Sequence, residues 1–150
     1  MTRLATFTRQ SRYWLLATLL TLSSAAWAGP PAQAYLARQF LLALLHGHFD
    51  QAYKQLAPET RQRLSRQQFR QAAAPLYERG KQAGPAIELY RLGLRLGEGD
   101  DAQWFYAFTF KRDSATTAPP QLDVTFGDSA ATQVLEFRLV PGKARQIQAD

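Results

Sequence analysis

The amino-acid sequence predicts an α+β fold, with three N-terminal helices packed on a bent antiparallel sheet of about four strands. Up to Gly84-Pro85 the apolar residues recur at the spacing of helices, and after this point they alternate as they do in strands. Helices that are followed by a strand meander are typical of α+β folds, in which the helices cover one face of the sheet.

The first 28 residues are predicted to be a signal peptide that lies outside this fold. They begin with three arginines and no acidic residue, and an apolar run over 14–22 follows. Ala26-Trp27-Ala28 then has small residues at the −3 and −1 positions of a cleavage site. The arginines are Arg3, Arg9 and Arg12.

The alternative for this segment is a retained membrane anchor. Its uninterrupted stretch, 13–28, has 16 residues, whereas a spanning helix needs about 20 mainly apolar residues. We therefore expect cleavage after Ala28, export to the periplasm or the medium, and a single domain over 29–150.

Composition excludes several classes of function. The chain has no cysteine, which excludes thiolate metal sites and thiol redox chemistry and leaves packing to stabilise the domain. Without the three leader arginines, the 18 basic residues become 15 against 12 acidic ones, and the net charge falls from +6 to +3. Because this is far from the concentrated basic footprint of a nucleic-acid-binding protein, we expect no nucleic-acid partner and at most peripheral membrane contact.

The first helix is expected over 32–45, with Gly47 in the position of a helix C-cap. Asp50 is expected to N-cap a short second helix, with Phe49 as the hydrophobic staple before it.

Pro58 ends this second helix and can begin one further turn through Leu64. Ser65 and Gln68 have the spacing of a capping box and open the third helix, which Gly80 is expected to close.

The first strand is expected over 87–96. Its apolar residues change from odd to even positions, which predicts a β-bulge near Tyr90 or Arg91. A turn over 97–101 leads to a second strand over 103–111.

A polar loop over 113–120 precedes a third strand over 122–126. The fourth strand is expected over 135–139 with its odd-numbered residues facing the core, and a frayed strand follows around Ile147.

Three features of this order carry a resemblance to a known family. They are the link Gly47-His48-Phe49-Asp50-Gln51-Ala52-Tyr53 between the first two helices, Leu64-Ser65 before the third, and the bent meander. The chain resembles, over about residues 33–148, the nuclear transport factor 2-like superfamily and its small exported bacterial members of unknown function. The resemblance implies a curved sheet around the third helix, forming a cone with an internal cavity. The superfamily includes isomerases, cyclases, dehydratases and non-catalytic binding or dimerisation modules, so it does not by itself choose a function.

The titratable residues do not point to catalysis. His46, His48 and Asp50 form a metal-like cluster, but they fall across a helix end and a cap and lack a fourth ligand. The acidic residues of 98–101 belong to a hydrated turn. We expect no metal, no cofactor and no catalytic residue.

The densest charge feature is a set of four arginines over residues 61–70, which reach from the turn after Pro58 into the third helix. We interpret it as a solvated helix face, on which Arg66 and Arg70 lie one turn apart. The alternative is contact with an anionic surface, such as lipid head groups or a cell-envelope polymer. The four are Arg61, Arg63, Arg66 and Arg70.

The second strand is apolar on both faces, unlike a strand that is buried on one side only. Core packing accounts for one face. A ligand, a second subunit or a further layer of chain is expected to cover the other.

These observations favour an exported, non-catalytic binding module. It would hold a small apolar or amphipathic ligand, or a partner protein, in the cavity between the third helix and the sheet. The alternatives are a lyase or isomerase that uses the same cavity, and an envelope scaffold that forms a homodimer through its sheet face. Because tyrosine and tryptophan combine apolar area with a hydrogen-bonding tip, the expected lining residues are Tyr53, Tyr77, Tyr90, Trp104 and Tyr106.

Overall fold

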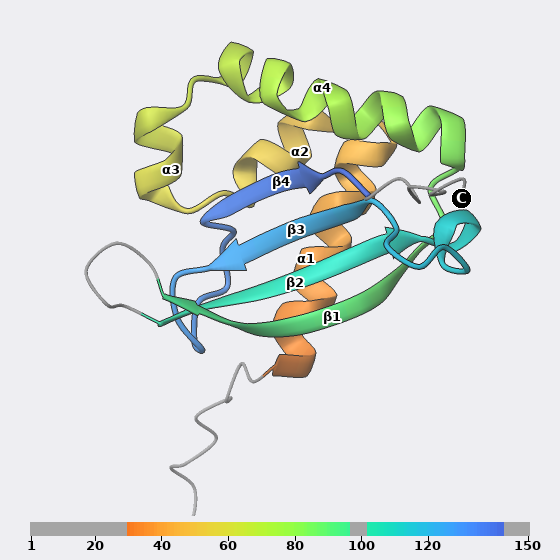
Figure 1. Cartoon of the computed structure of the whole chain (residues 1–150). Coiled ribbons are helices and arrows are strands. Elements are labelled where there is room, and N and C mark those ends of the chain that lie inside the picture. The colour runs from red at the N-terminus through yellow and green to blue at the C-terminus, as the bar shows by residue number, and fades with distance from the viewer. Residues whose placement is uncertain (1–29, 97–101, 143–150) are drawn as a thin grey trace, which may run out of the picture.

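Four α-helices precede a sheet of four strands in the part of the chain that the structure describes (Figure 1). A computed structural model describes residues 30–96 and 102–142, with side chains from residue 32 onward. The α+β class is confirmed, with four helices in place of the expected three. The helices are α1 (Pro30–Leu45), α2 (Phe49–Lys54), α3 (Pro58–Arg63) and α4 (Arg66–Ala83), and the strands are β1 (Ile87–Leu96), β2 (Ala102–Phe110), β3 (Gln121–Phe126) and β4 (Glu136–Val140).

The sheet is a meander in the order β1-β2-β3-β4, and each neighbouring pair is antiparallel. The expected bulge is present in β1. Leu89 lies opposite Phe108, and Arg91 lies opposite Ala107, so that Tyr90 is the extra residue. The bulge keeps Leu89 and Leu92 on the same face of the sheet although their positions differ in parity.

Helix α1 covers one face of the sheet and crosses behind its strands in Figure 1. Because its apolar residues recur every three to four positions, they form one stripe that points at the sheet. Each fully buried large side chain in this layer contributes about 1.5–3 kcal/mol to stability. The buried side chains of this core include Phe40, Leu41 and Leu44 of α1, Phe69 and Leu76 of α4, and Tyr106, Phe108, Phe110, Leu122, Val124 and Phe126 of the sheet.

Two glycines act where α1 and α4 meet. Gly47 has a φ of 76° and ends α1 in a Schellman motif, with its own N–H bonded to Leu44 O and the His48 N–H bonded to Ala43 O. Gly80 does not end α4 as expected, because the helix continues to Ala83. Gly80 is buried, and a Cβ at this position would lie 2.7 Å from Leu45 Cδ2. The glycine therefore allows the two helices to approach closely.

The segment between α2 and α4 departs from the expected pattern in two ways. Pro58 stands in the first turn of a separate helix, α3, which is why there are four helices. Asp50 does not cap α2, because His48 holds the N-cap position and Asp50 lies in the first turn. The capping box of Ser65 and Gln68 is confirmed at the start of α4.

Gln33 of α1 joins three parts of the fold through one buried side chain, which is 1% exposed. Its Nε2 donates to the carbonyls of Asp128 and Ala131, each at 2.8 Å. Its Oε1 accepts a hydrogen bond from the Tyr106 hydroxyl at 3.0 Å. The amide therefore fixes α1 against β2 and against the connection between β3 and β4.

The same connection is held from its other side by the start of α3. The Ala57 N–H donates to Val134 O at 2.8 Å, and the Val134 N–H donates to Gln55 O at 2.9 Å. The Thr60 hydroxyl donates to Leu135 O at 2.7 Å. The signal peptide over 1–28 and the strand around Ile147 lie outside the described residues.

Replacing Gln33 with leucine should lower the free energy of unfolding by about 2–4 kcal/mol, because one buried hydroxyl and two carbonyls would lose their partner. Urea unfolding followed by circular dichroism measures the change. Gln71→Leu, on the exposed surface of α4, is the matched control and should change stability little. Equal losses in the two variants would contradict the role given to Gln33.

Burial raises the pKa of the Tyr106 hydroxyl above its ordinary value of 10.0. The unfolded chain releases this proton at a lower pH than the folded one. The stability that the neutral hydroxyl contributes is therefore complete below about pH 10 and is lost as the pH rises toward the folded pKa, by at most about 1.4 kcal/mol per pH unit. Urea unfolding between pH 8 and 11 should show that Tyr106→Phe, unlike Tyr35→Phe, removes part of this alkaline slope.

Candidate functional site

The sheet face opposite α1 carries a buried carboxylate between two arginines. Strand alternation places Asp123 on this face, where its side chain is 1% exposed. Its Oδ2 accepts hydrogen bonds from Arg95 Nη2 and from Arg138 Nη2, each at 3.3 Å. Within the described part of the chain, Asp123 Oδ1 has no hydrogen-bond partner. Two cations therefore share one anion.

The second face of β2 is covered, over Phe105, by arginine side chains. The guanidinium groups of Arg91 and Arg95 lie 5.7 and 4.8 Å from the centre of the Phe105 ring. A Cβ on Gly93 would come within 2.9 Å of the same ring, so the glycine leaves room for it. The guanidinium groups themselves therefore lie over the ring, and that of Arg95 also binds Asp123.

A groove of about 640 Å³ lies where α3 and α4 meet the ends of β1, β2 and β4. Arg63, Arg95 and Glu136 supply its charges. Leucine, alanine and phenylalanine side chains supply its apolar part, and Thr60 and Gln103 are polar. The lining residues are Thr60, Arg63, Leu64, Ala72, Arg95, Leu96, Gln103, Leu135, Glu136 and Phe137.

Local structure holds the walls of this groove in place. Leu64, in extended conformation, is the C-cap of α3, and the capping box at Ser65 then restarts the chain as α4. The Thr60 hydroxyl ties α3 to the start of β4 through Leu135 O. Phe137 packs against the rings of Phe40 and Phe69, with centroids 5.4 Å away in each case, so this part of the wall rests on the core.

The five aromatic residues expected to line one pocket come from four different elements, and none of them lines the groove. The Tyr53 hydroxyl donates to Leu64 O at 2.9 Å. Tyr77 packs against Phe49. Tyr90 is the bulge residue and is 46% exposed. The other two belong to the sheet, where Trp104 packs against the core and Tyr106 is fully buried.

The four clustered arginines separate into different roles. Arg66 and Arg70 share a helix face, as expected, and both bind Asp50 in exposed ion pairs of 3.1 and 3.2 Å. Arg63 lines the groove. Arg61 is half-buried, and its Nε has no hydrogen-bond partner within the described residues.

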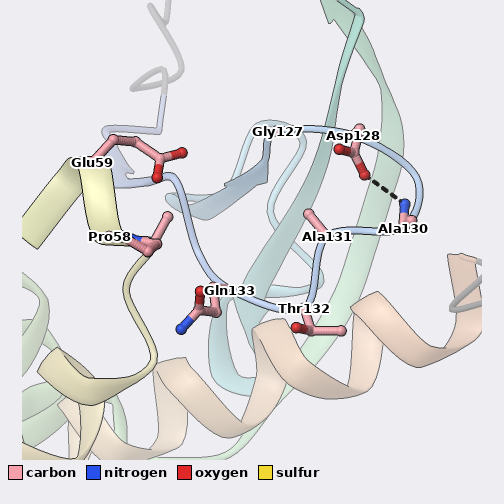
Figure 2. Close-up of a pocket in the computed structure, with 9 residues that line it drawn as sticks. Pro58, Glu59, Gly127, Asp128, Ala130, Ala131, Thr132 and Gln133 are labelled. Carbon is pink, nitrogen blue, oxygen red and sulfur yellow. Dashed lines mark hydrogen bonds between the residues drawn. The ribbon is translucent and has the colours of Figure 1, made fainter.

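A smaller pocket of about 380 Å³ lies between the start of α3 and the β3–β4 connection (Figure 2). Glu59 faces it from α3. Asp128 lies on the opposite wall and accepts a hydrogen bond from the Ala130 N–H at 2.7 Å (Figure 2). Pro58 and Ala131 supply apolar surface between them. The pocket borders the connection that Gln33 holds.

The two histidines lie at a third pocket, of about 180 Å³. His46 Nδ1 is 2.7 Å from Leu42 O, and the rings of His46 and His48 are stacked with centroids 6.1 Å apart. Among the described residues, no group of three or more histidine, aspartate and glutamate side chains is placed to hold a metal ion. Nor does any helix in the described ranges have the length and apolar character needed to cross a bilayer.

Sequence reasoning missed the cluster of Arg95, Asp123 and Arg138. The sequence does contain a signal for it, because Asp123 is the one charged residue of the strand Gln121–Phe126. A carboxylate at such a position is buried with the strand and needs cationic partners from its neighbours. Finding these partners requires the register of the sheet.

Comparisons with family models, with curated proteins and with solved structures find no match to this chain. The resemblance to the nuclear transport factor 2-like superfamily therefore rests on the link over residues 47–53, on Leu64-Ser65 and on the order of elements. Function has to be argued from the geometry of the site.

Asp123→Asn should lower the free energy of unfolding by about 2 kcal/mol, because two partly buried guanidinium groups lose their anion. Asp50→Asn is the matched control, since Asp50 also binds two arginines but is 60% exposed. Its loss should stay below about 1 kcal/mol. Chemical unfolding measures both. If Asp123→Asn lowered the free energy of unfolding no more than Asp50→Asn does, burial of the Asp123 carboxylate would not strengthen its ion pairs.

Proposed function

We propose that this chain is an exported, non-catalytic binding module that holds a small amphipathic molecule with an anionic head in the groove between α3, α4 and the sheet. The observation that carries the proposal is the lining of the groove, which combines apolar side chains with the guanidinium groups of Arg63 and Arg95. Its volume of about 640 Å³ lies within the range of about 300–1,000 Å³ that is common for small-molecule sites.

The apolar part of the groove suits a short hydrocarbon chain or ring. Phe137 is held by core aromatic residues, and Leu64 is partly buried against the same core. Ligand atoms that cover these side chains would contribute about 25 cal/mol for each Å² of apolar surface removed from water.

The charged part favours an anionic head group. A guanidinium group can donate two parallel hydrogen bonds to a carboxylate or phosphate, which gives direction as well as affinity. Arg63 comes from α3 and Arg95 from the end of β1, so a head group between them would contact both layers of the fold. Glu136 adds one negative charge and would favour a head group with a hydrogen-bond donor beside the anion.

The absence of a catalytic role is proposed from the state of the buried carboxylate next to this groove. Asp123 could act as a general base only with a free, accessible oxygen. Its Oδ2 is bound by two arginines, and its Oδ1 is buried. Asp123 therefore orients Arg95, which lines the groove, and the lyase or isomerase alternative has less support.

The proposal also includes the compartment in which the protein acts and the fold family to which it belongs. We place the protein outside the cytoplasm, with its leader cleaved after Ala28, and group it with the nuclear transport factor 2-like domains. The supporting observations are the basic, apolar and small-residue regions of the leader and the helices-then-meander order.

Filling the groove should abolish binding of an anionic amphiphile. The probe is 8-anilinonaphthalene-1-sulfonate, followed by fluorescence and displaced by decanoate. Ala72→Phe should weaken probe binding by about tenfold or more, because the new ring occupies the apolar part of the groove.

Ala74→Phe is the matched control, because Ala74 is also exposed on α4 and does not line the groove. Arg63→Gln should weaken the displacement by decanoate but leave decanol unaffected, whereas Lys54→Gln removes the same charge elsewhere. Equal binding by Ala72→Phe and Ala74→Phe would overturn the proposal.

A further inference from the structure

The exposed apolar residues of this protein are concentrated on one strand. Of the six large apolar side chains that are strongly exposed in the described part of the chain, five belong to β1. Leu92, Leu94 and Leu96 are 48, 56 and 71% exposed. Side chains of this kind at the edge of a sheet are uncommon on monomeric proteins and mark contact surfaces.

β1 also has an open side. It pairs with β2 along one edge, and it is the first strand of the sheet order, so within the described residues its other edge is unpaired (Figure 1). Such an edge presents backbone N–H and C=O groups that can pair with another strand. Beyond the bulge at Tyr90, the strand continues with regular register from Arg91 to Leu96.

The side chains of residues 91–96 in one copy of the chain fit those of the same segment in a second copy. If two copies pair in antiparallel orientation about Leu94, then Leu94 lies opposite its symmetry mate and Leu92 lies opposite Leu96. All three leucines then share the face that α1 covers, whereas Arg95 lies opposite Gly93, which has no side chain to obstruct it. A register centred on Gly93 would instead oppose Arg91 and Arg95, and like charges directly opposite are destabilising.

The area fits a weakly associating pair. From their exposed fractions, Leu92, Leu94 and Leu96 offer on the order of 350 Å² per copy, so that two copies would bury on the order of 700 Å² of apolar surface in addition to the paired backbone edges. Interfaces of this size are typical of weak, transient association. A two-fold interface of this kind uses the same patch on both subunits.

We propose that two copies of this chain associate through antiparallel pairing of their β1 strands about Leu94, forming one continuous eight-stranded sheet. The interface uses the leucines of β1 and leaves most of the ligand groove open, since of the residues that line the groove only Arg95 and Leu96 belong to the paired segment. The proposal is independent of the ligand-binding function. Measurements of the oligomeric state and of the distance between symmetry-related residues test it.

Because the chain has no cysteine, single cysteine variants report this geometry directly. Leu94→Cys should form an intermolecular disulfide on mild oxidation, since directly opposite residues have Cα atoms about 4.5–5.5 Å apart. Leu92→Cys is the control, because its symmetry mate would lie about 13 Å away along the strands. A mixture of Leu92→Cys and Leu96→Cys chains should again cross-link.

Light scattering on the chain as the cell processes it should show a dimer that dissociates on dilution. Leu94→Lys should weaken it by about tenfold or more, because two ammonium groups would meet at the axis, whereas Ala74→Lys should not. Circular dichroism checks that both variants are folded.

Three results would overturn the proposal: a monomer at 200 µM, a dimer in which Leu94→Cys does not cross-link, or a monomer whose Leu94-dependent binding is to phosphatidylglycerol vesicles.

Discussion

The buried amide of Gln33 is the constraint on which the rest of the structure depends. All three of its hydrogen bonds are made only if α1 has one rotation and one height on the sheet. With α1 fixed at this end, Leu45 at the other end sets the approach of α4 through Gly80. The carbonyls that Gln33 binds belong to the β3–β4 connection, which α3 also holds. The walls of the groove are thus positioned by a polar contact that lies outside it.

The parts of the fold that are encoded locally could be predicted from the sequence. The β1 bulge follows from a change in parity over six residues, and the capping box needs only Ser65 and Gln68. Gly80 resembled a helix end because its role depends on Leu45, which is distant in sequence. Asp50 resembled an N-cap because its actual partners, Arg66 and Arg70, belong to a different helix.

The site was harder to predict because it depends on strand register. Tyr53, Tyr77 and Tyr106 were expected in a pocket because of their residue type alone. In the structure the hydroxyl groups of Tyr53 and Tyr106 hydrogen-bond to other elements, and the ring of Tyr77 packs against Phe49. The sequence shows that the second face of β2 is apolar, but the guanidinium groups that lie over Phe105 are not among the coverings expected from it. Arg95 belongs both to this covering and to the groove. A ligand that attracts its guanidinium group would therefore compete with Asp123 for it.

The sequence separation of the Gln33 contacts has a consequence for how the chain folds. The meander itself joins neighbouring strands and closes short loops, whereas Gln33 lies 95 and 98 residues from the carbonyls that it binds. Loop-closure entropy makes such contacts late events. During synthesis from the N-terminus, α1 can pack against α2 and α4 early, but the hydrogen bonds of Gln33 cannot form until Ala131 is available. The part of the apolar stripe of α1 that faces the sheet therefore stays accessible to other proteins until the strands of the meander have been synthesised.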